Sequence, residues 1–267
     1  MKYFIKLIYT RKNNMYKSDV ETIKKLAEKK VRYANEEPGK YIGRAILTGF
    51  YIMVAIILSY TTGAILYPVS HEVSKILVAA TFCFAIAMIV FLSGELFTGN
   101  NFVMCVGMYE KRVTFANSLK IWAYSFLGNS IGLIIFGYLF IKSGASLSAI
   151  QHYIEPIVTA KLELSIPEMI LRGVLCNFSV CLAYLSGIKM KTEIGKLAMM
   201  FFAVFAFIIA GFEHSIANVG VFTVGYFALG GLPMMLVLKN LFFVVIGNII
   251  GGGILLALPI VYIATEE

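Results

Sequence analysis

Charged residues are scarce in this chain, and their scarcity excludes a water-soluble domain. Asp, Glu, Lys and Arg make up only 14% of its 267 residues, whereas 59% are hydrophobic. Soluble proteins contain about a quarter charged residues, and the mean hydropathy of this chain is +0.82. Of its 23 basic residues, 12 precede residue 45, so the net charge of +8 is concentrated at one end. This skew does not indicate a nucleic-acid-binding surface.

Cysteine and histidine are also few, which leaves little for metal or redox chemistry. The four cysteines lie inside apolar runs, without the C-x-x-C spacing of a zinc or redox site. The three histidines, His71, His152 and His214, include no pair at ligand spacing. We therefore expect no metal and no cofactor, and a membrane-embedded enzyme is the weakest hypothesis. The first 40 residues are charged throughout and lack the apolar core of a cleavable signal peptide.

What the chain does contain is six long apolar stretches, each long enough to cross a membrane, for which about 20 residues suffice. They cover residues 42–66, 75–109, 117–141, 168–188, 196–228 and 233–263. The second and fifth are too long for one plain span and carry polar interruptions, so we predict broken helices there. This organisation predicts an all-α membrane protein with a leader (1–40), a six-span channel domain (41–263) and a short tail (264–267).

The charges outside these stretches predict the orientation. One side of the membrane would carry 18 Lys and Arg residues and the other 5. The positive-inside rule therefore places both termini in the cytoplasm of a multi-pass protein of the cytoplasmic membrane. Within the leader, Ser18 and Glu21 have the spacing of a capping box, which predicts a basic amphipathic helix to about residue 34, lying on the membrane surface.

The second half of the chain repeats the first. Leu119-Lys120, Gly128-Asn129 and Gly132 recur 119 positions later as Leu238-Lys239, Gly247-Asn248 and Gly251. Glu95 and Asn100 recur at offset 118 as Glu213 and Asn218, and Ile46, Leu47 and Gly49 match Ile170, Leu171 and Gly173 more weakly at offset 124. Each repeat (41–141 and 168–263) holds three spans, an odd number, so the second must cross the membrane in the opposite sense. Inverted repeats of this kind are typical of transporters and channels, with the ligand path at the broken helices.

Ionisable residues inside the membrane are costly and are functional candidates by default. Glu95 and Glu213 could either hold the unwound backbone or line a path for cations. His214 could be a neutral hydrogen-bond partner or a group that changes charge near neutral pH. Thr98 could cap a half-helix or donate its hydroxyl to a passing solute.

Other residues have a plain and a functional interpretation as well. Lys161, in the connection before the fourth stretch, could be a solvated loop residue or could raise the local anion concentration. Leu96 and Phe207 could be packing residues or constrictions. The glycines of the third and sixth stretches suit close helix packing, and Asn129 or Asn248 beside them could face the pore.

Three motifs in order carry a family resemblance. Residues 94–100 (GELFTGN), 175–177 (LCN) and 211–218 (GFEHSIAN) resemble the formate/nitrite transporter family, and the resemblance covers about residues 35–263. It implies a homopentamer in membrane lipid, an aquaporin-like protomer fold with one pore per protomer, and transport of small monovalent anions such as formate, nitrite, hydrosulfide, acetate or lactate.

The resemblance also implies the residues of the path. They are the pore histidine His214, the loop threonine Thr98, the vestibule lysine Lys161, the asparagine Asn177, and the constriction residues Leu96, Phe207, Phe82, Ile86 and Val180. The supporting residues are Glu213 and Asn218, with Glu95 and Asn100 at the equivalent positions of the first break.

We therefore expect a channel or transporter for small weak-acid anions, gated or proton-coupled through His214, with no nucleic-acid partner. The hydrosulfide branch is one candidate because an apolar, cysteine-tolerant lining suits a soft anion. The alternative is an aquaporin-like pore for small neutral solutes. Against it stand Lys161, a titratable His214 and the lack of an Asn-Pro-Ala pair at the breaks.

Overall fold

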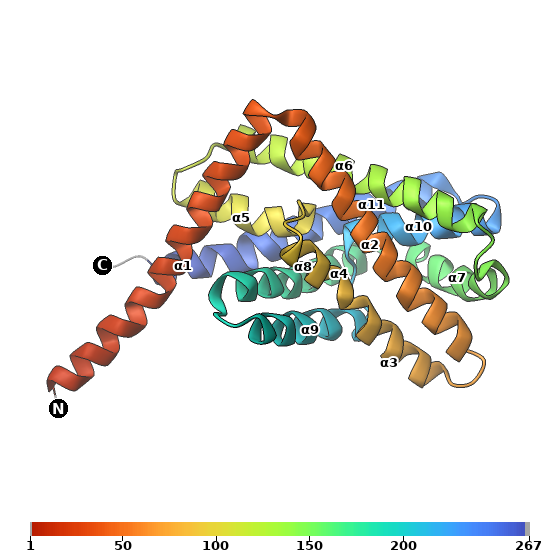
Figure 1. The fold of residues 1–267 in the computed structure, drawn as a ribbon, viewed down its shortest axis with the longest axis horizontal. Coiled ribbons are helices and arrows are strands. Elements are labelled where there is room, and N and C mark those ends of the chain that lie inside the picture. Colours follow the sequence, from red (N-terminus) through yellow and green to blue (C-terminus); the bar gives the residue numbers. More distant parts are fainter. Residues whose placement is uncertain (1, 265–267) are drawn as a thin grey trace.

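A computed structural model describes residues 2–264 of the chain, with side chains described from residue 16 onward. Every regular element in this part of the chain is a helix (Figure 1). In order they are α1 (Lys2–Glu36), α2 (Pro38–Leu66), α3 (His71–Phe82), α4 (Phe84–Phe91), α5 (Phe97–Tyr109), α6 (Phe115–Lys142), α7 (Leu147–Leu162), α8 (Ile166–Lys189), α9 (Glu193–Ile209), α10 (Ser215–Leu229), α11 (Met234–Ile249), the π-helix η1 (Ile250–Ala257) and α12 (Leu258–Ala264).

Five helical stretches of the described chain are long and apolar enough to span a membrane. They are Pro38–Leu66, His71–Phe91, Phe115–Lys142, Ile166–Lys189 and Met234–Ala264, and Ser215–Leu229 is a shorter apolar helix. The fifth predicted stretch (196–228) is thus divided between α9 and α10, neither of which reaches that length alone. The chain is an all-helical, multi-pass membrane protein.

The two longest predicted stretches are interrupted at equivalent places. Helix α4 ends at Phe91 and α5 begins at Phe97, while α9 ends at Ile209 and α10 begins at Ser215. In the connecting segments Ser93 and Gly211 adopt positive φ angles of 56° and 75°, a backbone conformation that cannot continue a right-handed helix.

Glycines set the closest helix contacts and correct one predicted register. A Cβ atom at Gly132 would overlap the carbonyl oxygen of Ile46, so α6 packs closely against α2. A Cβ atom at Gly251 would overlap the carbonyl oxygen of Val174, so η1, which continues α11, packs against α8 in the same way. These equivalent contacts relate α2 to α8 by an offset of 128, from Ile46 to Val174. The predicted offset of 124 is therefore wrong by about one helical turn, a shift that leaves the same faces in contact.

The leader does not behave as predicted. Helix α1 begins at Lys2, not at Ser18, and the capping box of the described chain lies at the start of α8, between Ser165 and Glu168. The apolar face of α1 packs on the helical body, because Val20, Ile23 and Ala27 are buried there. The N-terminal part of α1 extends beyond the body (Figure 1). Residues 18–34 thus form a helix whose apolar face covers one end of the bundle, and their predicted position at the membrane surface stays a prediction.

Candidate functional site

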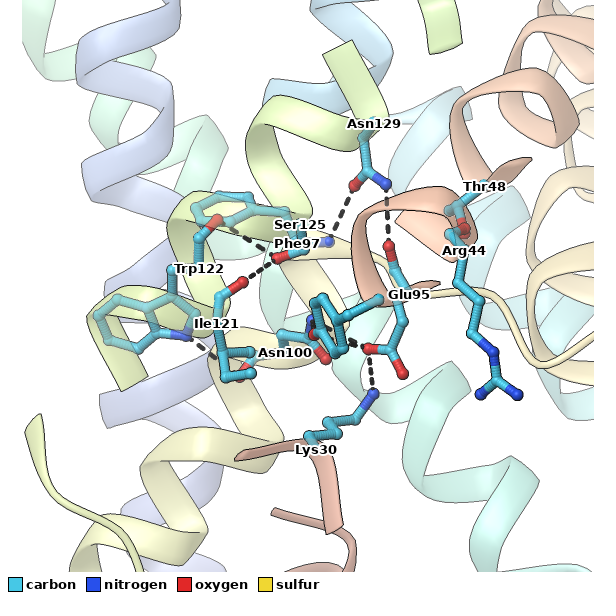
Figure 2. A network of polar contacts seen from close by, with 11 residues as sticks. Lys30, Arg44, Thr48, Glu95, Phe97, Asn100, Ile121, Trp122, Ser125 and Asn129 are labelled. Carbon is cyan, nitrogen blue, oxygen red and sulfur yellow. Dashed lines mark hydrogen bonds and ion pairs between the residues drawn. The ribbon is translucent and has the colours of Figure 1, made fainter. Parts of the chain in front are cut away.

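One buried asparagine holds the first helix break in place. Asn129 Oδ1 accepts the Phe97 N–H at 3.0 Å, and its Nδ2 donates to the Glu95 carbonyl oxygen at 2.9 Å (Figure 2). The same Nδ2 donates to the Ala45 carbonyl oxygen at 2.8 Å. The Phe97 N–H is one of the donors that a helix start leaves unpaired. Asn129 therefore supplies hydrogen bonds to backbone groups at the break that lipid could not satisfy.

A second asparagine does the same at the other break. Asn248 Oδ1 accepts the Ser215 N–H at 2.9 Å, and its Nδ2 donates to the carbonyl oxygens of Gly173 at 2.8 Å and Glu213 at 3.0 Å. Both asparagines are fully buried. All the described bonds of these two amides go to the main chain, so their geometry fits a structural role and not the pore-facing one.

A narrow apolar cavity of about 20 Å³ lies between the two breaks. Its lining is Ile52, Phe82, Ala85, Ile86, Ile89, Leu96, Val180, Val204, Phe207 and His214. All the predicted constriction residues are among them, while Ile52, Ala85, Ile89 and Val204 were missed. A space this small holds at most about one water molecule.

Eight of the ten lining residues come in equivalent pairs from the two halves. Ile86 and Val204, Ile89 and Phe207, and Leu96 and His214 are each 118 positions apart, and Ile52 and Val180 are 128 apart. The cavity therefore lies between matching positions of the two repeats. In one of these pairs an apolar side chain is matched by a polar one, where His214 occupies the place of Leu96.

His214 is held at both ring nitrogens. Its Nδ1 accepts the Ala217 N–H at 3.0 Å, which caps α10, and its Nε2 lies 2.9 Å from Thr98 Oγ1. The ring stacks on Phe207, with centroids 6.1 Å apart. Because Nδ1 accepts a hydrogen bond, the neutral ring must carry its proton on Nε2, facing Thr98.

Asn177 links the two breaks and does not line the cavity. Its Nδ2 donates to the carbonyl oxygens of Thr98 at 3.2 Å and Asn248 at 2.6 Å, and the side chain is fully buried. The structure thus places Asn177 beside the predicted path, where it fixes the Thr98 backbone.

Lys161, Glu213, Asn218 and Asn240 form what we call the α7-side cluster. Lys161 Nζ donates to both carboxylate oxygens of Glu213, at 2.8 and 2.9 Å, and to Asn218 Oδ1 at 2.9 Å. Asn240 bridges the Asn218 amide and the Lys161 carbonyl oxygen, both at 2.9 Å. A lysine ammonium has three donors, so every N–H of Lys161 already has an acceptor. Asn240 was missed because it has no counterpart in the first repeat.

Lys30, Tyr41, Glu95 and Asn100 form the α1-side cluster, and Figure 2 shows Lys30, Glu95 and Asn100. Glu95 Oε2 accepts from Lys30 Nζ at 2.5 Å, from the Tyr41 hydroxyl at 2.9 Å and from Asn100 Nδ2 at 3.3 Å. The Lys30 side chain, from α1, is only 5% exposed. The indole of Trp122 donates to the Asn100 carbonyl oxygen at 3.2 Å.

Lys30 was missed because it was counted among the surface charges of the leader. One signal could have found it, since Lys30 and Lys161 each lie on the helix that precedes the first span of a repeat. Each pairs with the glutamate of the corresponding break. A cavity of about 520 Å³ adjoins the α1-side cluster and opens between α1, α8 and the α4–α5 connection.

Within the described residues no group of three His, Cys, Asp or Glu side chains is placed to hold a metal ion. Cys83, Cys105, Cys176 and Cys181 are free and buried, and none of them lines the narrow cavity.

Sequence comparison assigns the chain to a family and names its relatives. The family model described as "Formate/nitrite transporter" matches residues 18–262. The chain is 31% identical over 236 residues to the "Uncharacterized transporter YwcJ" of Bacillus subtilis, covering 87% of this chain and 92% of the relative. It is 30% identical to the "Formate-nitrite transporter" of Plasmodium falciparum (90% and 82% covered) and 30% identical to the "Nitrite transporter NirC" of Escherichia coli (89% and 90% covered).

Solved structures agree with the sequence relatives. An "FNT family ion channel" superposes with a TM-score of 0.85 at 26% identity, covering 93% of this chain and 99% of that one. A "Pentameric formate channel with formate bound" has the same fold, with a TM-score of 0.73 at 21% identity over 84% and 96% of the two chains. The predicted family is confirmed: this chain belongs to the formate/nitrite transporter family.

Proposed function

We propose that the protein is a channel for small monovalent weak-acid anions, such as formate or nitrite, and that each protomer of a homopentamer has its own path. The observation that carries the proposal is the narrow cavity, whose lining is apolar except for His214. The names of the relatives support the substrate class, and the pentameric formate channel with the same fold supports the assembly.

The path would run through a six-span inverted repeat in the cytoplasmic membrane, with broken second and fifth spans. The equivalent pairs around the cavity and the matching roles of Asn129 and Asn248 support this arrangement. The excess of Lys and Arg on the side of α1 supports a cytoplasmic location for that side and for both termini.

The proposed mechanism uses His214 as a neutral donor. An ionised solute that entered the apolar cavity would lose its hydration at a cost of several kcal/mol or more. A second proton on His214 would have to displace the Ala217 N–H from Nδ1, next to the positive end of the α10 dipole. We therefore infer that the solute takes its proton from the aqueous side, crosses as the neutral acid, and is met midway by the His214 Nε2–H and the Thr98 hydroxyl.

The two clusters would then guide the solute without holding it tightly. Lys161 and Lys30 are each paired with a glutamate, so neither cluster presents an uncompensated positive charge. We therefore expect Lys161 to attract anions only weakly, through the dipole of the Lys161–Glu213 pair. Weak binding at both ends suits a conducting path, because a solute must leave as well as enter.

The neutrality of both pairs also favours a second candidate, a pore for small neutral solutes. Proteoliposome flux discriminates the two. We expect formate and nitrite to cross with one proton each, so that a pH gradient drives flux and an imposed membrane potential changes it little. Fluxes of hydrosulfide, water and glycerol measured in the same vesicles would rank the solutes. Rapid glycerol or water flux without any anion flux would overturn the proposal.

A further inference from the structure

We propose that the hydroxyl of Tyr184 donates a hydrogen bond to the anion in the α1-side cavity, where it completes a one-sided binding site with Lys30. The inference rests on the proposed function, because the ligand is the transported anion. Tyr184 lies on α8 and lines the 520 Å³ cavity together with Lys30, Gly94 and Glu95.

A count of donors shows which groups around this cavity are free to bind. Lys30 Nζ has one described acceptor, Glu95 Oε2, so two of its three N–H groups remain available. The Tyr184 hydroxyl has no hydrogen-bond partner among the described residues. The Tyr184 side chain is partly buried and lines the cavity, so its hydroxyl can meet a solute there. In the α7-side cluster, by contrast, Lys161 has no donor to spare.

The ring of Tyr184 is held in place against the first turn of α5. A Cβ atom at Gly99 would lie 2.5 Å from Tyr184 Cε2, so the phenol packs directly against the first turn of α5. That turn also contains Thr98, the partner of His214. A hydroxyl fixed on this ring can bind an anion with little further loss of side-chain freedom.

The two halves differ in the free donors of their lysines. At the offset of 128, Tyr184 corresponds to Ile56, which packs against Gly220. Tyr60, one helical turn further along α2, interacts with Glu213 as Tyr184 interacts with Glu95. Lys161, however, has no donor to spare, whereas Lys30 has two. We therefore expect the anion to bind more tightly on the α1 side than on the α7 side. Because Glu95 balances the charge of Lys30, neutral donors such as the Tyr184 hydroxyl would supply much of the binding.

The test is the half-saturating concentration of formate or nitrite measured from each face, in membrane vesicles of both orientations. For Tyr184→Phe we expect this concentration to rise about tenfold from the α1 face, equal to about 1.4 kcal/mol, and to stay unchanged from the α7 face. Flux at low concentration must change equally in both directions, because a passive path obeys microscopic reversibility. Tyr138→Phe, an exposed tyrosine on α6, is the matched control and should behave as wild type.

Trp122 allows binding to be measured without transport. It is the chain's single tryptophan and donates to Asn100 of the α1-side cluster, so formate binding should change its fluorescence. Tyr184→Phe should shift that titration by the same factor. Unchanged values from both faces, or equal rises from both, would overturn the role of Tyr184 while leaving the proposed function intact. A wild-type protein without any anion flux would overturn the proposed function and this inference with it.

Discussion

Breaking the Lys161–Glu213 ion pair should destabilise the protein strongly. The side chains are only 17% and 5% exposed, so Lys161→Met would leave the Glu213 carboxylate buried with Asn218 as its remaining described partner. Removing one member of a buried pair typically costs about 3–5 kcal/mol, because the other charge is left uncompensated. We therefore expect Lys161→Met to lower the free energy of unfolding by about that amount.

The double variant Lys161→Met/Glu213→Gln provides the critical comparison. Glutamine keeps the shape of Glu213 and can still accept from Asn218, and it carries no charge that needs a partner. Most of the lost stability should therefore return, as it does when a buried pair is replaced as a whole. Unfolding would be followed in mixed detergent micelles for the wild type, both single variants and the double variant.

A surface pair of the same kind serves as the control. Lys40 and Glu37 lie 2.9 Å apart but are 70% and 43% exposed, so Lys40→Met should cost at most about 1 kcal/mol. If Lys161→Met cost no more than Lys40→Met, or if the double variant were as unstable as the single one, burial would not be what makes the α7-side pair important.

Three further predictions follow from the site and the packing. Asn129→Leu leaves the Phe97 N–H without its partner and should lower the free energy of unfolding by about 1–3 kcal/mol or more, as measured by thermal unfolding. Unchanged stability would mean that other contacts hold the first break. His214→Asn can still cap α10, so anion flux should fall while its pH profile keeps the wild-type shape; loss of the pH dependence would make His214 the proton carrier after all. Gly132→Leu would force a side chain into the Ile46 carbonyl and should abolish the folded oligomer, whereas a pentamer is expected for the wild type by mass measurement in detergent.

The helix breaks were predictable because their causes are local. Each break is a polar segment inside an apolar run of more than 30 residues, which is too long for one plain span. In lipid every backbone group needs a partner, so an interruption at the polar segment is the expected result. The family motifs were predictable as well, and the resemblance that they carry also pointed to Leu96, Phe207 and Val180, which line the narrow cavity.

The register of the first and fourth spans was not predictable in this way. Matches at offsets of 124 and 128 differ by about one helical turn and present nearly the same face. The contacts of Gly132 with Ile46 and of Gly251 with Val174 select 128. Backbone overlap decides the register, and residue identity alone does not carry that information.

The sequence by itself determined the class of the protein, because hydropathy, charge asymmetry and a duplicated pattern of Gly, Asn and Glu are properties of the chain and need no partner in space. Only the tertiary structure decided which charged and polar groups are buried and what they bind. Lys30 lies in a leader that has the composition of a surface segment. The apolar face of α1 nevertheless packs on the body, which brings Lys30 into contact with Glu95, 65 residues away. The sequence does not say which ring nitrogen of His214 carries the proton, and the N-terminus of α10 makes Nδ1 the acceptor. Burial and hydrogen-bond partners come from segments far apart in the chain, so the state of a polar group is set where those segments meet.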